Sequence, residues 1–581
     1  MIRKILTVFV AVSLVVISSV SVNAGSVKLT WDHFYDGPAV LEALKSLNSE
    51  YADLTELRVI GQSEEGRDIW LFTINNPKTG KDSEKPGIYL DGSIHGNEIT
   101  ATEVCLYVAW YLLDSYDDIP MVKELVDSRV FYIVPIVNVD SRARFFTDPS
   151  NYNYGRTGRV PYDDDRDGLL DEDDVDDLDG DGEILQMRIK DPFGGWKTHP
   201  DDPRVMIRTK PWEKGEWRRL GDEGIDNDGD GRVNEDWPGY LDMNRNYGFR
   251  WQPMYVQGGA GDYPMSGKVT KAVSDFILTK PNICFGFAFH NSGGMILRGP
   301  GSKLAGMYSP KDIEVYDFLG EEGEKIIPGY RYLIGMDDLY TTHGDFGEWM
   351  FSCMGIHAFT GELFMSTQER YRKPGGTSGG SDEPDKAYYG GTPGDERQKF
   401  SDNVNQGVMF RDWRKFDHPQ FGEIEIGGWR KLTTRVPPLF MLHEMLHRNA
   451  SLVLLAGKHA PDIELELLEV KKLGNGLSRI RVRASNPNAI PTLSTIAQRH
   501  DLARKDIFKI EGSGFEVVSG GVLKDLHYDR VQPVQHRPHM VFTTIPSFGK
   551  TDVQWIVKGT GKAKITFDSI KAKNRTLTVS L

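Results

Sequence analysis

Patterns typical of strands and helices alternate along the chain from about residue 30 to residue 458. Residues 87–94 form a short apolar run, residues 100–113 carry apolar side chains at helical spacing, and residues 130–137 form a second continuous apolar run. Continuous apolar runs of this length are typical of strands buried on both faces of a parallel sheet. The pattern therefore predicts an α/β layered domain.

Two segments interrupt this alternation. Residues 148–240 are acidic and rich in glycine, and residues 372–400 contain two Gly-Gly pairs. Glycine-rich polar sequence without a helical or strand period is typical of loops. Both segments are predicted to be loop-like insertions within a first domain of residues 25–459.

The character of the chain changes after Pro461. Short β-rich runs separated by Asn, Pro and Gly predict a separate β-sandwich-like domain over residues 460–581, with one helical stretch near residues 492–504. The clearest runs are residues 463–470, 478–484 and 553–557.

The N-terminus resembles a secretory signal. Arg3 and Lys4 precede an apolar run over residues 5–16, and Val22-Asn23-Ala24 forms a small-residue cleavage site. We expect residues 1–24 to be removed and the protein to be secreted or periplasmic. A membrane anchor is the alternative, although the apolar run is short for spanning a bilayer. No later segment is expected to span a membrane.

Length and charge narrow the class of protein. At 581 residues the chain exceeds the roughly 250–300 residues at which single cores stop growing, which favours two domains. The formal net charge of -15 argues against a nucleic-acid partner, because phosphate binding needs a basic surface. The three cysteines, Cys105, Cys284 and Cys353, lie in apolar surroundings and are expected to be buried thiols, with any disulfide pairing left open.

Candidate chemistry begins at His95-Gly96-Asn97-Glu98, directly after the first predicted strand. A strand end that turns into a helix can direct an imidazole and a carboxylate at one point, and zinc accepts both ligand types while keeping a position open for water. Taken alone, the pair fits a structural, hydrogen-bonded histidine better than a metal site.

Further motifs follow in order: Gly61 to Arg67, Asn138-Val139-Asp140, Asn244-Arg245-Asn246, His290 at the end of a strand over Cys284 to Phe289, and Gly361-Glu362-Leu363. In this order and context the chain resembles the zinc carboxypeptidase family, which contains carboxypeptidases A, B and T. The resemblance runs from about Gly61 to Phe364. One departure is Val139, where the family usually has proline.

The resemblance implies a fold and a set of roles. The fold would be a mixed eight-stranded sheet sandwiched by helices, followed here by the β-sandwich. The implied site residues are the zinc ligands His95, Glu98 and His290, the catalytic carboxylate Glu362, the carboxylate-binding pair Asn244 and Arg245, and the substrate-capping Tyr340. A planar guanidinium such as that of Arg245 binds a carboxylate through two hydrogen bonds.

The family also implies an arginine that stabilises the oxyanion, placed between Asn138 and Asn244. The insertion leaves Arg144, Arg156 and Arg159 as candidates, and we favour Arg156. The specificity position implied by the family falls on Gly347, so the preferred side chain stays open.

The first insertion has a chemistry of its own. Three segments place acidic residues at alternate positions before a glycine, which is the spacing of calcium-binding loops. A solvated acidic linker is the alternative. The expected calcium ligands come from Asp163, Asp165, Asp167, Asp174, Asp177, Asp179, Asp181, Asp226, Asp228 and Asp230.

A second metal motif is His443-Glu444-Met445-Leu446-His447, which matches the His-Glu-x-x-His pattern of other metallopeptidases, with Glu466 as a candidate third ligand. Because the stretch around Glu466 has a strand pattern, we expect residues 438–455 to form only an amphipathic helix that closes the first domain.

These observations predict a secreted zinc carboxypeptidase with structural calcium, acting on peptides or proteins that have a free C-terminal carboxylate. The alternatives are a family member that acts on cell-wall peptides or amides, and an inactive calcium-stabilised binding module.

Overall fold

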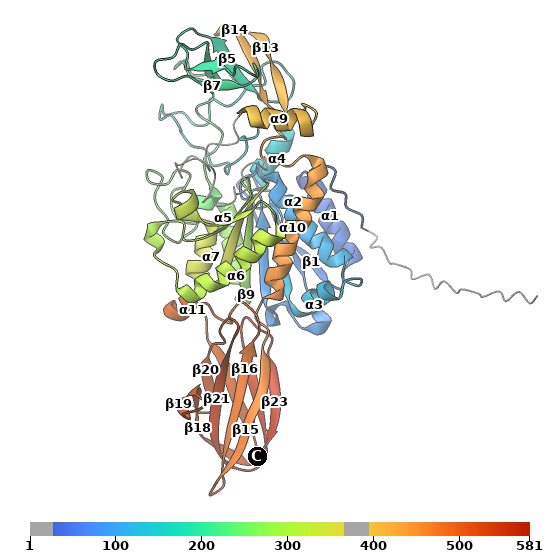
Figure 1. Ribbon diagram of the computed structural model, residues 1–581, viewed down its shortest axis with the longest axis vertical. Coiled ribbons are helices and arrows are strands. Elements are labelled where there is room, and N and C mark those ends of the chain that lie inside the picture. Colours follow the sequence, from blue (N-terminus) through green and yellow to red (C-terminus); the bar gives the residue numbers. More distant parts are fainter. Residues whose placement is uncertain (1–26, 365–393) are drawn as a thin grey trace, which may run out of the picture.

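The computed structural model describes residues 27–364 and 394–581. Three parts are stacked along its long axis, with an α/β body in the middle, a small β-sheet at one end and a β-sandwich at the other (Figure 1). The predicted mixed eight-stranded sheet is confirmed. Its strand order is β1 (Thr55–Gln62), β2 (Asp68–Ile74), β4 (Val130–Val134), β3 (Gly87–Gly92), β9 (Ile283–Asn291), β12 (His357–Leu363), β10 (Met295–Arg298) and β11 (Arg331–Ile334).

The four central strands β4, β3, β9 and β12 are parallel, and antiparallel pairings occur toward both edges. Successive side chains of a strand face opposite sides, and here each side has its own core. Ile88 and Leu90 of β3 lie in one core and Tyr89 between them lies in the other. Strand β4 ends at Val134, earlier than the predicted 137, because Pro135 has no N–H to donate to a ladder.

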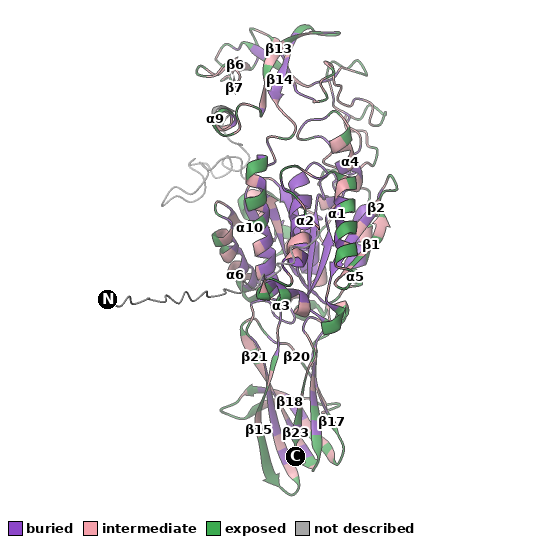
Figure 2. Cartoon of the chain, turned by 90° about the vertical axis from the view of Figure 1, so that its right-hand side faces the viewer, coloured by how far each residue is buried: buried purple, intermediate pink, exposed green. Residues whose placement is uncertain are grey.

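Helices cover both faces of this sheet, which lies buried between them (Figure 2). One core is built with residues of α1 (Gly37–Glu50), α2 (Ile99–Asp114), α3 (Pro120–Ser128), α6 (Pro310–Ile326) and α10 (Leu439–Lys458). The other is built with residues of α5 (Lys268–Leu278) and α7 (Phe346–Met354). The helix predicted over residues 438–455 is therefore present as α10.

The first insertion is not only loop. After α4 (Val139–Thr147) it contributes four strands to a six-stranded sheet whose other two strands come from beyond residue 400. The order is β13 (Phe410–His418), β14 (Gly422–Trp429), β5 (Gln186–Lys190), β8 (Trp217–Asp222), β6 (Trp196–Thr198) and β7 (Met206–Arg208). Met187 and Ile426 belong to its small core. These strands were missed because they are short and the segment is dominated by acidic residues and glycine.

The second predicted insertion falls mainly on residues outside the described ranges. Its last residues belong to helix α9 (Gly394–Val404), so the prediction of loop up to residue 400 is wrong there.

The C-terminal part is a β-sandwich, as predicted. A five-stranded sheet packs on a four-stranded sheet. The order of the first sheet is β15 (Glu464–Gly474), β16 (Leu477–Asn486), β21 (Gly549–Gly559), β18 (Phe515–Asp525) and β19 (Arg530–Pro533). The order of the second is β20 (Met540–Thr543), β17 (Asp506–Gly512), β22 (Lys562–Asp568) and β23 (Arg575–Ser580). The fully buried Trp555 lies in the core between them. The predicted helix is shorter than expected, α11 (Thr495–His500), and ends where Asp501 adopts a left-handed conformation.

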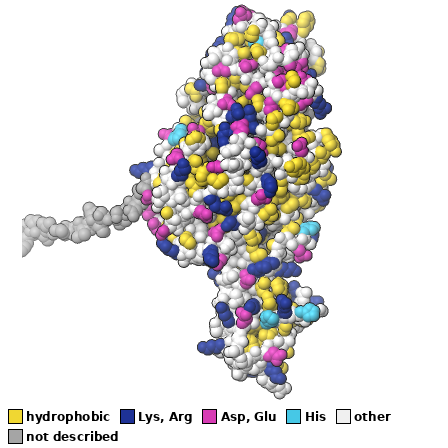
Figure 3. Space-filling model, turned by 180° about the vertical axis from the view of Figure 1, so that it is seen from behind, with side chains coloured by type: hydrophobic (Ala, Val, Ile, Leu, Met, Phe, Trp, Pro, Cys, Tyr) yellow, Lys and Arg dark blue, Asp and Glu magenta, His cyan; other side chains and the backbone are white. Residues whose placement is uncertain are grey.

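Cys105 and Cys284 are buried, Cys353 is half-buried, and all three are free thiols. Among the helices of the described residues, none combines the length and hydrophobicity needed to cross a membrane. The molecule narrows between the α/β body and the C-terminal domain, and acidic and basic side chains are mixed over the face shown in Figure 3.

Candidate metal centre and substrate site

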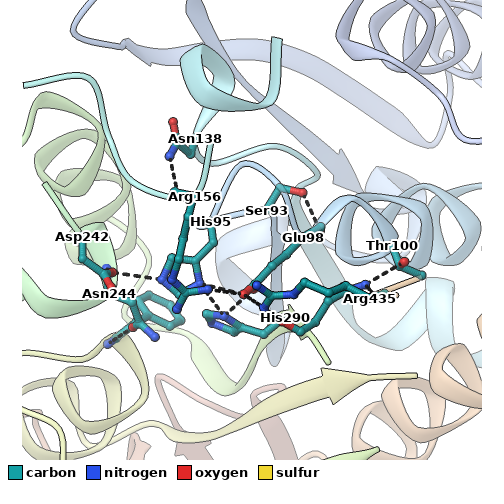
Figure 4. A network of polar contacts seen from close by, with 12 residues as sticks. Ser93, His95, Glu98, Thr100, Asn138, Arg156, Asp242, Asn244, His290 and Arg435 are labelled. Atoms are coloured by element: carbon teal, nitrogen blue, oxygen red, sulfur yellow. Dashed lines mark hydrogen bonds and ion pairs between the residues drawn. The ribbon is translucent and has the colours of Figure 1, made fainter. Parts of the chain in front are cut away.

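Three buried side chains meet at the carboxyl ends of the central parallel strands (Figure 4). His95 and Glu98 lie in the turn between β3 and α2, and His290 lies near the end of β9. The Nδ1 atom of His290 is 2.9 Å from Oε2 of Glu98 and 3.2 Å from Nδ1 of His95, and Nδ1 of His95 is 3.1 Å from Oε1 of Glu98. Two imidazoles and one carboxylate that converge in this way match the ligand set of a catalytic zinc site.

The turn depends on a glycine. A Cβ on Gly96 would lie 2.5 Å from the carbonyl oxygen of Gly155 and 2.6 Å from the backbone nitrogen of Arg142. No larger residue fits there without moving the backbone. The same contact brings the segment around residue 155 against the turn, and the N–H of Gly96 donates to the carbonyl of Arg156 at 3.1 Å.

His95 is oriented by a residue that the sequence analysis did not identify. Its Nε2 is 3.0 Å from Oδ1 of Asp242, so an N–H at Nε2 donates to that carboxylate and the lone pair of Nδ1 faces the cluster. Burial alone would raise the pKa of Asp242, but His95 and Arg245 hold this pKa far below its usual range. The only signal for Asp242 in the sequence was its position two residues before Asn244.

Two arginines contact the carboxylate of Glu98. Nη1 of Arg156 is 2.7 Å from Oε1 of Glu98, and Nη2 of Arg435 is 3.0 Å from the same oxygen. Burial opposes ionisation of Glu98, but His95, His290 and Arg156 together hold its pKa well below the usual range. Arg435 was not identified from the sequence, since it precedes α10 by a few residues and shares no motif with the other groups.

The other two candidate arginines lie elsewhere. Nε of Arg144 is 3.2 Å from Oε1 of Glu65, and Nε of Arg159 is 3.7 Å from the same oxygen. Of the three candidates, Arg156 is therefore the one that contacts the metal-ligand cluster.

Glu362 lies beside His290 because β12 and β9 are parallel neighbours and these two residues are paired in register. Its side chain is partly exposed. Burial and the nearby charge of Glu98 raise the pKa of Glu362 to about 7, while His290, Arg435 and Arg156 act in the opposite direction. A carboxylate with a pKa near neutrality can both accept and return a proton.

Arg245 interacts with Asp242, the residue that contacts His95, and it is only 7% exposed. Its Nη1 donates to the carbonyl of Asn244 at 2.9 Å, and its Nη2 is 3.3 Å from the hydroxyl of Tyr340. Burial would lower the pKa of Arg245, but the carboxylate of Asp242 raises it above its usual value. Tyr340 is 38% exposed, so the guanidinium lies behind an accessible phenol ring.

Asn244 and Gly347 support the same region. The side-chain oxygen of Asn244 accepts a hydrogen bond from the backbone N–H of Phe346 at 2.9 Å, which ties the Arg245 segment to the start of α7. A Cβ on Gly347 would lie 3.5 Å from the hydroxyl of Thr360 on β12. Gly347 thus leaves room beside the strand that carries Glu362.

The three acidic loops share a local geometry. In each loop the first aspartate, Asp163, Asp177 or Asp226, accepts a hydrogen bond from the N–H of the glycine five residues later. Three clusters of carboxylates result, namely Asp163, Asp165 and Asp167; Asp165, Asp228, Asp230 and Glu235; and Asp177, Asp179 and Glu223. Burial raises the pKa of Glu235 to about 8, with the carboxylates of Asp173 and Asp230 acting in the same direction.

Three predicted calcium ligands also have partners in the protein. Asp181 is bound by the guanidinium groups of Arg411 and Arg414, and Arg414 also contacts Asp179. Asp174 accepts a hydrogen bond from the hydroxyl of Tyr154 at 3.2 Å. Glu223 and Glu235, which do belong to the clusters, lie outside the alternating spacing by which the loops were recognised.

The second metal motif has a different setting. The hydroxyl of Tyr107 is 3.4 Å from Nε2 of His443 and 3.0 Å from Nδ1 of His447, on the helix that closes the α/β body. Within the described ranges these histidines are not part of a group of three metal-ligating side chains. Glu466 lies on β15 of the C-terminal domain.

Comparison with known proteins agrees with the geometry of the first cluster. Residues 40–176 match the family model of zinc carboxypeptidases. Carboxypeptidase D of Rattus norvegicus is 39% identical over 103 residues, which are 18% of this chain and 8% of that protein. The zinc carboxypeptidase of Saccharothrix mutabilis subsp. capreolus is 33% identical over 103 residues, 17% of this chain and 23% of that protein.

Over residues 40–176 the chain is similar to the zinc carboxypeptidase family. It spans only small parts of the relatives above, and the family match ends before Arg245, His290 and Glu362. Among solved structures, thrombin-activatable fibrinolysis inhibitor has a TM-score of 0.45 at 16% identity, covering 74% of this chain and 75% of that one. Carboxypeptidase A from Helicoverpa armigera has a TM-score of 0.41 at 17% identity, covering 67% and 77%. Residues 462–580 match a domain of unknown function.

Proposed function

We propose that this protein is a secreted zinc carboxypeptidase that removes residues one at a time from the C-terminal end of peptides. The observation that carries the proposal is the convergence of His95, Glu98 and His290, with Glu362 paired in register with His290 and the buried Arg245 close to Asp242, which contacts His95. Secretion is proposed from the sequence of residues 1–24 alone. An inactive binding module is not favoured, because the ligand set and Glu362 are both present.

The residues of the cluster suit the metal that the family implies. His95, Glu98 and His290 would hold zinc, which when bound supplies a Lewis acid that polarises a carbonyl and makes water more acidic. Asp242 keeps His95 in the tautomer that leaves Nδ1 free. Together these contacts favour zinc over a purely structural role for the two histidines.

The remaining groups would act on the peptide. Arg245 binds the terminal carboxylate, and Tyr340 covers it from the exposed side. Glu362 accepts a proton from the attacking water and returns it to the leaving amine. Arg156 faces the charge that develops on the carbonyl oxygen, a role worth on the order of 3 kcal/mol in comparable sites.

Product analysis tests this function directly. Peptides with free C-termini, incubated with the purified protein, should yield a ladder of products that shorten by one residue at a time, read by mass spectrometry. Removal of zinc with a chelator should stop the ladder, and added zinc should restore it. Internal fragments appearing before the ladder would contradict the proposal.

The acidic loops are proposed to bind structural calcium. Carboxylate oxygens at alternate positions before a turn glycine are the ligands that calcium prefers. Without a bound cation the three clusters bring like charges together, which costs free energy.

Calcium removal should therefore lower the melting temperature. An ion at about one hundred times its dissociation constant stabilises the folded state by roughly 2.7 kcal/mol, which corresponds to a shift of about 3 °C in a domain of the size of residues 25–459. The measurement is a thermal melt with and without a calcium chelator, with zinc content checked by metal analysis. Identical melting curves would make the loops a solvated acidic linker.

A further inference from the structure

A buried glutamate faces the second acidic loop. Glu223 follows strand β8 and its side chain is 0% exposed. Neither of its carboxylate oxygens has a hydrogen bond of normal geometry to any described residue, and Oδ1 of Asp179 is likewise without one. Oxygen atoms of Asp177, Asp179 and Glu223 all lie within 4.8 Å of one another. Asp177 and Asp179 are partly exposed, but a fully buried carboxylate beside two others is unfavourable without a cation.

The charge of Arg414 acts on this glutamate, but neither neighbouring arginine hydrogen-bonds its oxygens. Arg411 and Arg414 bind Asp181, and Arg414 also contacts Oδ2 of Asp179. These contacts leave Oδ1 of Asp179 and both oxygens of Glu223 unpaired. The arginines therefore pair with Asp181 and with Oδ2 of Asp179, and not with the oxygens that face one another in the cluster.

Protonation of Glu223 is the alternative to a bound ion. Burial raises the pKa of Glu223 to about 8, with the charges of Asp179 and Asp181 adding to the effect and the backbone N–H of Leu185 opposing it. A protonated carboxyl group still needs an acceptor for its O–H. Within the described part of the chain, no group accepts one from Glu223.

We propose that Asp177, Asp179 and Glu223 bind one calcium ion. Calcium takes oxygen ligands at about 2.3–2.6 Å, so two ligands of one ion lie up to about 5 Å apart, as these oxygens do. The set contains no nitrogen or sulfur atom, which disfavours zinc and copper. The inference rests on the calcium proposed above for the acidic loops, and it replaces Asp181 with Glu223 in the ligand set.

The ion would connect the loop to the segment that carries Arg156. The carbonyl of Glu223 accepts a hydrogen bond from the N–H of Asp176 at 3.1 Å, next to the loop. The neighbouring Asp222 accepts one from the side chain of Asn151 at 2.7 Å, and the side-chain oxygen of Asn151 accepts one from the N–H of Tyr154 at 3.0 Å. Calcium at Glu223 would thus stabilise the segment over residues 150–157.

Calcium titration of the full-length protein tests the site without any substrate. Glu223→Gln keeps the shape of the side chain and removes its charge, and the matched control Asp201→Asn removes an exposed carboxylate of the same insertion. Isothermal titration should show that Glu223→Gln weakens one calcium equivalent by about tenfold or more, because affinity follows the number of charged ligands. Asp201→Asn should titrate like the unmodified protein.

Hydrogen exchange adds a local readout. Removing calcium, or introducing Glu223→Gln in its presence, should increase exchange over residues 177–182 and 150–157. If Glu223→Gln fails to fold by circular dichroism, Asp177→Asn replaces it and should lose the same equivalent.

Each result decides between the proposals. A Glu223→Gln or Asp177→Asn protein that titrates like the unmodified one overturns this site, and if Asp163→Asn then loses calcium, the general assignment of the loops survives. A protein that binds no calcium at all overturns both calcium proposals. The carboxypeptidase proposal is unaffected in either case, because product ladders test it separately.

Discussion

Replacing His290 with alanine is expected to abolish zinc binding and peptidase activity together. The three ligand atoms come from a turn and a distant strand, so two remaining ligands would hold the ion too weakly. Zinc lowers the pKa of a bound water to about 7, and we expect its loss to reduce kcat/KM by on the order of 10³-fold or more. The measurements are zinc content by elemental analysis and hydrolysis of a peptide with a free C-terminus.

His447→Ala is the matched control, because it removes an imidazole from the second metal motif on α10. That protein should keep one zinc and its activity. A His290→Ala protein with full zinc, and a loss of zinc only on changing His443 or His447, would transfer the metal site to α10 and contradict the assignment.

Amidating the C-terminus of a substrate should reduce its hydrolysis sharply. The guanidinium of Arg245 is nearly buried, and an amide leaves it without the charge that it is proposed to bind. Breaking such a desolvated pair costs on the order of 2 to 5 kcal/mol, which is roughly a 30-fold to several thousand-fold fall in kcat/KM. The measurement compares kcat/KM for matched free-acid and amide peptides.

A double comparison isolates this one interaction. Arg245→Ala should impose a similar penalty on the free acid and little further loss on the amide, since both changes remove the same contact. Arg144→Ala, which removes an arginine that contacts Glu65 away from the cluster, should leave both rates unchanged. Equal rates for acid and amide peptides would exclude a carboxypeptidase even with zinc bound.

The α/β body was predicted from continuous apolar runs and from apolar side chains at helical spacing. The apolar runs that became β3 and β4 and the helical spacing of α2 were recognisable because strands and helices buried in a parallel sheet carry little polar sequence. The strands β5 to β8 were not recognisable, because each is three to six residues long and their sheet is completed by β13 and β14 from beyond residue 400. Pairing over such a distance leaves no local period.

The candidate site shows the same division. His95, Glu98, His290, Arg245 and Glu362 were predicted from the resemblance of short motifs, in their order along the chain, to the zinc carboxypeptidase family. Asp242, Arg435 and Glu223 carry no such motif, and their importance follows only from the atoms that they contact. The choice of Arg156 over Arg144 and Arg159 likewise needed a distance to Glu98.

The sequence by itself indicated several strands and helices of the α/β body, the resemblance to zinc carboxypeptidases and the residue types available for zinc, since these depend on local patterns and on short motifs. Only the tertiary structure decided which side chains share one point in space. It placed Asp242 on His95 and two arginines on Glu98, and it brought Glu223 to a loop forty residues earlier. The physical reason is that charge pairing and metal coordination act over a few ångströms between atoms, whatever their separation along the chain.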